Sequence, residues 1–268
     1  MIDSPYVVKP GTKLKIAGYP TNDTGKFKNR DDAALETAAH LRRLDELQEV
    51  MYAEGKHALL IVFQAMDAGG KDGAIEYVFS GINPQGCMVT SFKVPTPLEK
   101  AHDFLWRIHG ACPPKGLIGI FNRSHYESVL VERVGQITAE KVWRKRYEHI
   151  NAMEQMLTDE GTTIVKFFLH ISKDEQKQRL QARLDDPHKN WKFNPGDLEM
   201  RKQWDAYQQA YEDVLARCST EAAPWYVVPA DRKWFRNWVV SDVLVRTLEK
   251  LDMKFPKPLE NLGQYVIE

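Results

Sequence analysis

One glycine-rich stretch carries the residues of this chain that are best suited to phosphate chemistry. Residues 63–73 read FQAMDAGGKDG and follow an apolar run at 58–63 that predicts a strand buried on both faces. The residues from Gly73 onward predict a helix. In a turn between a strand and a helix, backbone N–H groups and the positive end of the helix dipole meet phosphate oxygens, and Lys71 adds a full charge. The predicted phosphate contacts in this stretch are Ala68, Gly69, Gly70, Lys71, Asp72 and Gly73.

The stretch departs from the Walker A pattern G-x-x-x-x-G-K-[ST] at two positions. Ala65 replaces the first glycine, and Asp72 replaces the hydroxyl residue that holds magnesium. A further carboxylate, Asp67, lies inside the loop, where it would repel a phosphate chain unless a cation lay between them. Since Mg²⁺ binds carboxylates together with phosphate oxygens, we predict that Asp67 holds Mg²⁺. The alternative is that Asp67 only caps the following helix.

Two more predicted strands bring polar residues to the same edge of the sheet. The strand at 116–121 is followed by Asn122 and Arg123, and the strand at 87–92 is followed by Lys93. Ligands of open α/β sheets bind at the carboxyl ends of strands, so we expect these side chains to meet phosphate. Arg123 is the stronger candidate because a guanidinium can hold phosphate oxygens with two parallel hydrogen bonds. For Lys93 the alternative is an exposed loop lysine.

The segment after Arg123 adds two more polar residues. Glu127 lies one turn farther along, where its carboxylate is placed to contact a second metal ion or an acceptor. His125 is assigned to packing or capping, since nothing in the sequence pairs it with a nucleophile.

A loop that mixes basic, aromatic and hinge-forming residues predicts a helical lid at about 179–200. Residues 186–197 contain Pro, Gly, Trp and Phe between two predicted helices, a composition typical of a lid that closes over phosphates. The alternative is a plain connector between helices. A basic row from the lid and from the loop after the last strand is predicted to bind phosphate: Arg179, Arg183, Lys189, Lys192, Arg232 and Lys233.

Three runs of this sequence strongly resemble the polyphosphate kinase 2 family: MDAGGKDG at 66–73, FNRSHYE at 121–127, and the segment 183–193. The resemblance extends from about Leu35 to Leu251. It implies a P-loop kinase fold resembling thymidylate kinase, with inorganic polyphosphate as phosphoryl donor or acceptor. It also implies that Arg123 positions the acceptor phosphate. Members with Asn at position 122 resemble the subgroup that acts on both AMP and ADP.

The expected activity is therefore a reversible phosphoryl transfer between polyphosphate and AMP or ADP, which forms ADP or ATP with Mg²⁺ as cofactor. Asp67 would hold Mg²⁺, while Lys71 and Arg123 would neutralise the transferring phosphoryl. Asn122, Arg123 and Glu127 would contact the acceptor nucleotide. One alternative is an ATP-dependent nucleoside monophosphate kinase, against which Ala65 and Asp72 argue only weakly. A non-catalytic nucleotide-binding protein is disfavoured because Asp67, Lys71 and Arg123 are all present.

The alternation of strands and helices predicts one α/β domain: a three-layer sandwich with a five-stranded, mostly parallel sheet. Residues 1–30 are predicted to be an arm, 31–255 the kinase domain, and 256–268 a tail. Single helices are expected at 98–109, with Trp106 in the core, and at 197–216. The basic residues 144–146 are expected to form a solvated helix face. The remaining predicted strands are 162–170 and 225–229.

Composition narrows the class of protein and its partners. The 268 residues are 43% apolar and carry 37 basic and 37 acidic side chains, so no global charge attracts nucleic acid or an anionic membrane. Three widely spaced cysteines suggest a reducing cytoplasm, and no apolar run approaches membrane-spanning length. We expect purine nucleotides and polyphosphate as partners. The family resemblance also implies a homo-oligomer, either a dimer or a tetramer.

Overall fold

A central parallel sheet organises the chain, which we describe for residues 1–260 and 262–267 in a computed structural model. The strand order is β2-β3-β1-β4-β5, and all four neighbouring pairs run parallel. The α/β fold is confirmed, and the sheet is wholly parallel where the sequence predicted a mostly parallel one. The strands are β1 (Ala58–Ala65), β2 (Cys87–Ser91), β3 (Ile118–Asn122), β4 (Thr162–His170) and β5 (Trp225–Pro229).

The apolar run of the first strand occupies the middle of the sheet. β1 pairs with β3 on one side and with β4 on the other, so Phe63 lies opposite Asn122 and Phe167. The Phe63 and Phe167 rings stack with centroids 5.3 Å apart. Every residue of β1 except the last is buried, because helices cover both faces of the strand. The loop that follows β1 therefore begins in the buried centre of the sheet.

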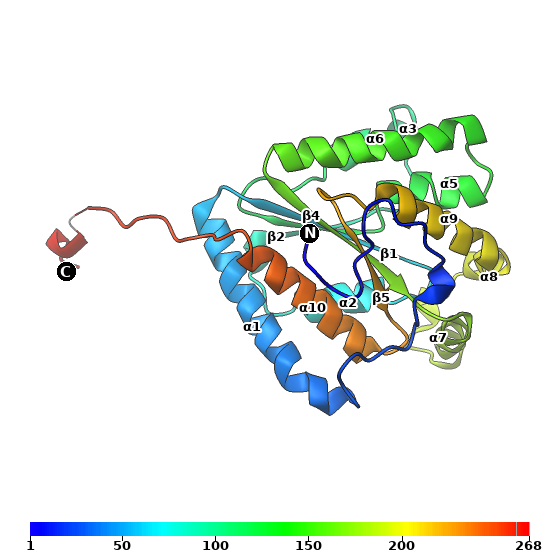
Figure 1. The fold of residues 1–268 in the computed structure, drawn as a ribbon, viewed down its shortest axis with the longest axis horizontal. Helices are drawn as coiled ribbons and strands as arrows, with labels where there is room; N and C mark the ends of the chain where they lie inside the picture. Colours follow the sequence, from blue (N-terminus) through cyan, green and yellow to red (C-terminus); the bar gives the residue numbers. More distant parts are fainter. Residues whose placement is uncertain (261, 268) are drawn as a thin grey trace.

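Two helical layers enclose the sheet (Figure 1). One layer contains α1 (Arg30–Glu54), α2 (Lys71–Val78) and α10 (Lys233–Glu249), and the other contains α6 (Glu140–Asp159) and α9 (Trp204–Cys218). Asn29 caps the start of α1 by accepting from the N–H groups of Asp31 and Asp32, and Gly55 ends it in the left-handed conformation. The result is the predicted three-layer arrangement.

Two predicted helices are each divided in the structure. The segment 98–109 forms α3 (Pro97–Lys100) and α4 (Trp106–His109), because the Asp103 carboxylate accepts the N–H of Leu105 and starts a new turn. The prediction that Trp106 lies in the core is wrong: its side chain is 44% exposed and stacks on His102.

The second divided helix belongs to the lid. Its residues form α8 (Pro195–Lys202), which is separated from α9 by Gln203. The side chain of Asn194 caps α8 by accepting from Gly196 N–H. The lid segment as a whole therefore comprises the end of α7 (Lys173–Asp185), a short 3₁₀ turn at Asn190–Lys192, and α8.

The prediction of a solvated basic face at 144–146 is wrong for Arg146. Its guanidinium donates to the Ser128 carbonyl oxygen at 2.9 Å and to Glu132 at 2.6 Å, and it lies over the Phe104 ring. Arg144 and Lys145 are exposed, as predicted.

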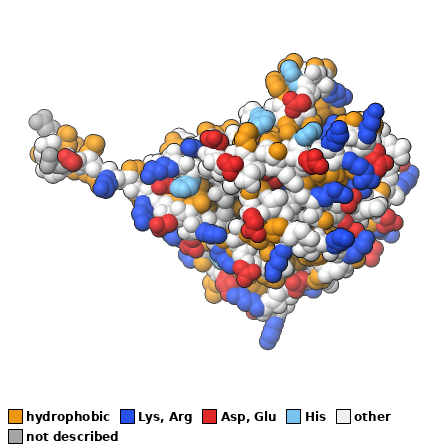
Figure 2. Space-filling view, turned by 45° about the horizontal axis from the view of Figure 1, so that its top comes forward, with side chains coloured by type: hydrophobic (Ala, Val, Ile, Leu, Met, Phe, Trp, Pro, Cys, Tyr) orange, Lys and Arg blue, Asp and Glu red, His pale blue; other side chains and the backbone are white. Residues whose placement is uncertain are grey.

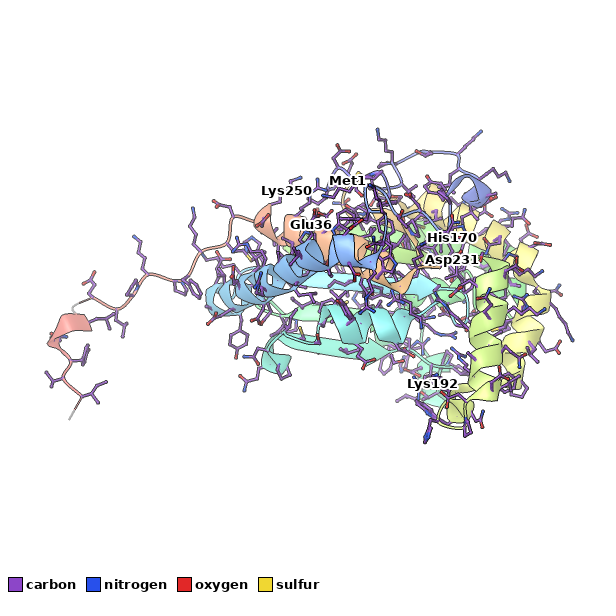
Figure 3. All side chains as sticks on the ribbon, turned by 90° about the horizontal axis from the view of Figure 1, so that it is seen from below. Met1, Glu36, His170, Lys192, Asp231 and Lys250 are labelled. Atoms are coloured by element: carbon purple, nitrogen blue, oxygen red, sulfur yellow. The ribbon has the colours of Figure 1, made fainter. Side chains whose placement is uncertain are left out.

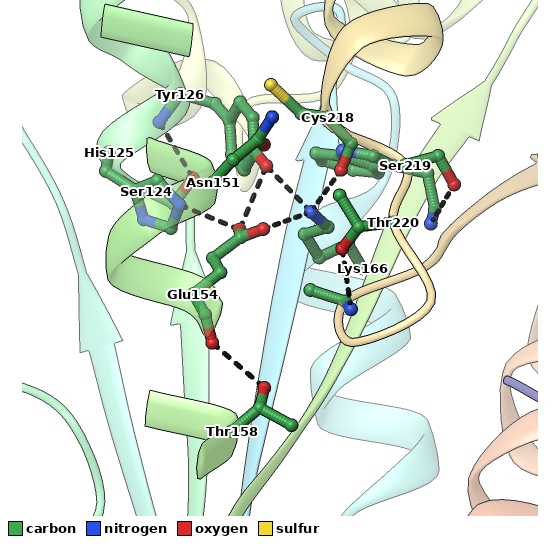
Figure 4. A network of polar contacts seen from close by, with 12 residues as sticks. Ser124, His125, Tyr126, Asn151, Glu154, Thr158, Lys166, Cys218, Ser219 and Thr220 are labelled. Carbon is green, nitrogen blue, oxygen red and sulfur yellow. Dashed lines mark hydrogen bonds and ion pairs between the residues drawn. The ribbon is translucent and has the colours of Figure 1, made fainter. Parts of the chain in front are cut away.

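A fully buried ionic network ties β4 to α6 and to the segment after β3 (Figure 4). The Lys166 ammonium donates to Tyr126 Oη at 2.8 Å, to Glu154 at 2.5 Å and to the Cys218 carbonyl oxygen at 2.7 Å. The ring of His125 contacts the same carboxylate through Nε2 at 3.1 Å. Burial lowers the pKa of His125, so the imidazole is neutral and donates to Glu154. His125 therefore packs within the structure, as predicted.

Residues 6–8 of the N-terminal arm lie along the outer edge of β5. The Val8 N–H donates to the Trp225 carbonyl oxygen, and the Val227 N–H donates to the Tyr6 carbonyl oxygen, each at 2.9 Å. At the other end of the chain, the tail leaves the body of the molecule and exposes apolar side chains such as Leu259 (Figures 1 and 2). On the face drawn in Figure 2, acidic and basic side chains are interspersed. No helix within the described residues is long and apolar enough to cross a membrane.

Candidate active site

The loop between β1 and α2, residues 66–70, has the backbone shape of a phosphate-binding turn, and we call it the P-loop. Ala68 and Gly70 both have positive φ, 59° and 92°. A Cβ atom on Gly69 would lie 2.4 Å from the Cβ of Ala65, so residue 69 must be glycine when Ala65 replaces the usual glycine. The loop leads directly into the first turn of α2, whose N–H groups have no intrahelical partners.

Two side chains of α7 hold P-loop carbonyl groups from outside. Gln176, which is almost fully buried, donates from Nε2 to the Asp67 carbonyl oxygen at 3.0 Å, and Arg179 donates from Nη1 to the Ala68 carbonyl oxygen at 3.1 Å. Carbonyl groups that are fixed in this way leave the loop amides to face an anion. Gln176 was not predicted as a site residue, because no local pattern distinguishes it from an ordinary helix residue.

Arg236 on α10 holds a third P-loop carbonyl. Its Nη1 donates to the Gly70 carbonyl oxygen at 2.9 Å, and a Cβ on Gly70 would lie 2.3 Å from the same nitrogen. Burial, with the nearby charge of Arg179, lowers the pKa of Arg236 to about 10, so the guanidinium stays charged at neutral pH. The sequence analysis missed Arg236, although its position three residues after Lys233 places both side chains on one helix face.

The Asp67 carboxylate meets the arginine that follows β3. Its Oδ1 accepts from Arg123 at 2.8 Å, and the other terminal nitrogen of Arg123 donates to Glu127 at 3.3 Å. The charge of Glu127, followed by that of Asp67, raises the pKa of Arg123 against the effect of burial. Arg123 itself has φ 62°, a strained value for a residue with a side chain. The three side chains thus form one charged cluster at the carboxyl ends of β1 and β3.

Asp67 has the free oxygen that a magnesium ligand needs. Its Oδ2 is buried and has no hydrogen-bond partner among the described residues, and Asp67 lines the cleft. α2 has no side-chain cap, so the alternative role of Asp67 as a cap is wrong. The described residues contain no group of three or more His, Cys, Asp or Glu placed to hold a metal ion. One carboxylate fits Mg²⁺ all the same, because this ion takes most of its ligands from water and phosphate.

Lys71 and Asp72 begin α2 on the wall of the cleft. Burial, followed by the charge of Arg123, lowers the pKa of the Lys71 ammonium. Asp72 accepts a hydrogen bond of 2.6 Å from the side-chain amide of Asn122. Asn122 thus orients a carboxylate of the loop, a contact that a carboxylate at position 122 could not make.

Apart from Gln176, these groups line one cleft of about 1890 Å³, at the carboxyl end of the sheet and under the lid. Thirteen Lys and Arg residues line it against seven Asp and Glu, whereas the whole chain has equal numbers. The cleft brings together the predicted site residues Asp67, Ala68, Gly69, Gly70, Lys71, Asp72, Gly73, Lys93, Asn122, Arg123, Glu127, Arg179, Arg183, Lys189, Lys192 and Lys233.

Arg232 is the predicted site residue that does not line the cleft. It precedes α10 with an extended backbone, φ −96° and ψ 104°, and its side chain is exposed. Burial lowers the pKa of Lys233, with further contributions from Arg179 and Arg236.

The lid cations differ in how they are paired. Arg183 contacts Asp197 at 3.0 Å, and Lys189 contacts Asp186 at 2.6 Å. Lys192 makes no ion pair within the described part of the chain and lies over the ring of Trp191, which is 78% exposed. Lys192 is therefore the lid cation whose charge is most available to a polyanion.

Three comparisons with known proteins agree with one another. The model of the family described as polyphosphate kinase 2 matches residues 27–256. The "AMP/ADP-polyphosphate phosphotransferase" of Meiothermus ruber is 57% identical over 98% of this chain and 99% of its own length, and the "ADP-polyphosphate phosphotransferase" of Rhodopseudomonas palustris is 47% identical over 94% and 91%. The crystal structure of polyphosphate kinase 2 from Arthrobacter aurescens TC1 superposes with a TM-score of 0.92 at 44% identity, covering 96% of this chain and 93% of that one.

Proposed function

Because this chain belongs to the polyphosphate kinase 2 family, we propose that it is an enzyme that transfers a phosphoryl group reversibly between inorganic polyphosphate and AMP or ADP. The observation that carries the proposal is the cleft, which is lined by the P-loop lysine and twelve further basic side chains in a chain of zero net charge. A nucleoside triphosphate needs few cations, whereas a chain of many phosphates can also use those that make no ion pair among the described residues, such as Lys192.

In the proposed reaction, the protein positions two phosphate groups and neutralises the charge between them. The P-loop amides and Lys71 hold the terminal phosphates of the donor. Arg123, which is fixed between Asp67 and Glu127, aligns the acceptor phosphate and stabilises the negative charge of the phosphoryl group during transfer. In-line transfer needs little covalent chemistry from the protein, so no nucleophilic side chain is required.

We propose Mg²⁺ as the cofactor, with Asp67 Oδ2 as its ligand from the protein. When bound, the ion would neutralise phosphate charge. Asp67 Oδ1 stays with Arg123, so the same carboxylate would fix both the cation and the arginine.

For the acceptor, we propose that both AMP and ADP are used and that Asn122 permits it. Its side-chain amide adds no negative charge next to the acceptor phosphates and donates a hydrogen bond to the Asp72 carboxylate. We further propose that the chain works in the cytoplasm as a homo-oligomer, which sedimentation of the purified protein would test.

The deciding assay combines AMP, polyphosphate and Mg²⁺ without ATP and separates the products by ion-exchange chromatography. Formation of ADP and then ATP supports the proposal. Lys71→Ala protein, purified in the same way, is the control for contaminating kinases. If the wild type forms ADP only when ATP is supplied, the chain is an ATP-dependent nucleoside monophosphate kinase instead.

A further inference from the structure

Residues 1–26 of the N-terminal arm lie outside the match to the polyphosphate kinase 2 family model, yet Thr21 contacts the loop that leads from β5 to the cleft residue Lys233. The Thr21 hydroxyl donates to Asp231 Oδ2 at 2.6 Å, and the Asp231 N–H donates to the Thr21 carbonyl oxygen at 3.1 Å. These two bonds join residues 210 positions apart in the sequence. They fix the loop that follows β5.

Asp231 also fixes the start of α7. Its Oδ1 accepts the N–H of Ser172 at 2.8 Å, and the Ser172 hydroxyl caps the helix by accepting from Glu175 N–H at 3.0 Å. Figure 3 places Asp231 next to His170, the last residue of β4, at this end of the sheet. One carboxylate therefore connects the arm, the loop after β5 and the first turn of α7.

Arg179 carries this connection to the P-loop. Its Nη2 donates to the carbonyl oxygens of Ala230 at 2.7 Å and Asp231 at 3.2 Å, while its Nη1 donates to the Ala68 carbonyl oxygen at 3.1 Å. Its Nε donates to Glu175 at 2.7 Å. All three guanidinium nitrogens are therefore held by protein acceptors, so Arg179 acts here as a bridge between two loops.

The contact between Arg179 and Ala68 holds a residue with a strained backbone. Ala68 has φ 59°, an unfavourable value for alanine that persists only when the surrounding structure holds it. The Arg179 guanidinium supplies that hold on one side of the loop. If the loop after β5 shifts, Arg179 shifts with it, and the P-loop amides lose their alignment.

We infer that Thr21 and Asp231 are positioning residues for phosphoryl transfer, which act through Arg179 on the P-loop. The inference rests on the proposed function for its substrates. Because a displacement of about 1 Å at a reacting group can cost about 100-fold in rate, a partial loss of this support should lower turnover measurably. It should leave polyphosphate binding largely intact, since the other cations of the cleft remain.

The test compares three variants within the arm. Thr21→Val removes the hydroxyl at similar volume, and Thr21→Ser keeps it. Lys15→Ala, at another position in the arm, removes an ion pair with Glu212 of α9. We expect kcat to fall about tenfold in Thr21→Val with KM for polyphosphate changed less than about twofold. Thr21→Ser and Lys15→Ala should keep wild-type kcat. Each variant is assayed well below its own unfolding temperature, so that a loss of stability is not measured as a loss of kcat.

A double-mutant cycle separates positioning from general loosening of the arm. In an Arg179→Lys background, Thr21→Val should lower kcat no further, because the bridge is already broken. If the two effects multiply instead, Thr21 does not act through Arg179 and the inference is overturned. Equal kcat in Thr21→Val and wild type overturns it as well. If the wild type uses only ATP as donor, the proposed function fails, and the same cycle measured with ATP still tests the arm.

Discussion

The Arg123 guanidinium donates to the Asp67 carboxylate across 2.8 Å, which joins the loop after β1 to the loop after β3. Only one oxygen of Asp67 is used, and the other is buried without a partner in the described structure. The pair therefore combines a fixed arginine with a carboxylate oxygen that is free to bind a cation. This arrangement leads to the first prediction.

Asp67→Asn should lower kcat by about 1000-fold, because several kcal/mol of transition-state stabilisation depend on the cation and on the Arg123 position. The Mg²⁺ concentration for half-maximal rate should rise as well. Glu76→Gln is the matched control, since it removes the same charge from an exposed residue of α2 that does not line the cleft. Near-normal turnover in folded Asp67→Asn protein would remove Asp67 from the metal site.

Lys71 gives a prediction about pH. Burial lowers the pKa of its ammonium below the ordinary 10.5, so the charge is lost at a lower pH than that of an exposed lysine. The kcat/KM of the free enzyme should therefore decline on the alkaline side earlier than an ordinary lysine would allow. Lys71→Arg should move the decline to higher pH, even if its turnover is lower. An alkaline limb unchanged in Lys71→Arg would assign the titration to another group.

Asn122→Asp should reduce the use of ADP more than the use of AMP. The new carboxylate would face Asp72 at the present hydrogen-bond distance of 2.6 Å and would add negative charge beside the acceptor. ADP carries more negative charge than AMP and should lose more kcat/KM. Both nucleotides are assayed at saturating polyphosphate. A ratio equal to that of the wild type would exclude Asn122 from acceptor selection.

The lid lysines should differ because their pairing differs. Lys189 already contacts Asp186, whereas Lys192 lacks an ion pair in the described residues. Lys192→Ala should raise KM for long polyphosphate more than Lys189→Ala does. Because salt screens exposed charges beyond a Debye length of about 8 Å, the KM of Lys192→Ala should also change less with salt concentration than that of the wild type. Lys202→Ala, an exposed charge change on α8 that does not line the cleft, is the control. Equal losses of kcat for every chain length would place the lid lysines at the reaction centre.

Lys166→Met should lower the free energy of unfolding by about 3–5 kcal/mol, because it leaves the Glu154 carboxylate buried without its cation. In the wild type, the Glu154 pKa is lowered despite burial, so its stabilisation is present at neutral pH and lost in acid. In the variant, burial without Lys166 raises that pKa, so protonation at low pH relieves the cost. Urea unfolding at pH 8 and pH 5 should show a smaller difference between variant and wild type at pH 5.

The sequence alone determined the elements whose signals are local. The strands at 162–170 and 225–229 have the predicted bounds, because an apolar run depends on neighbours in the chain. The P-loop is predicted from the sequence for the same reason, since the spacing of its glycines and the lysine at the start of a helix are local features. The family resemblance also rests on continuous runs.

The tertiary structure decided which of the basic residues are free. Arg179 looked like a phosphate ligand, yet carbonyl groups from 51 and 111 positions away in the sequence hold its guanidinium. Thr21 gave no local signal and Arg236 gave only its spacing from Lys233, because their partners, Asp231 and Gly70, are brought to them by the order of the strands. A hydrogen bond depends on distance in space, and only the packed sheet sets that distance.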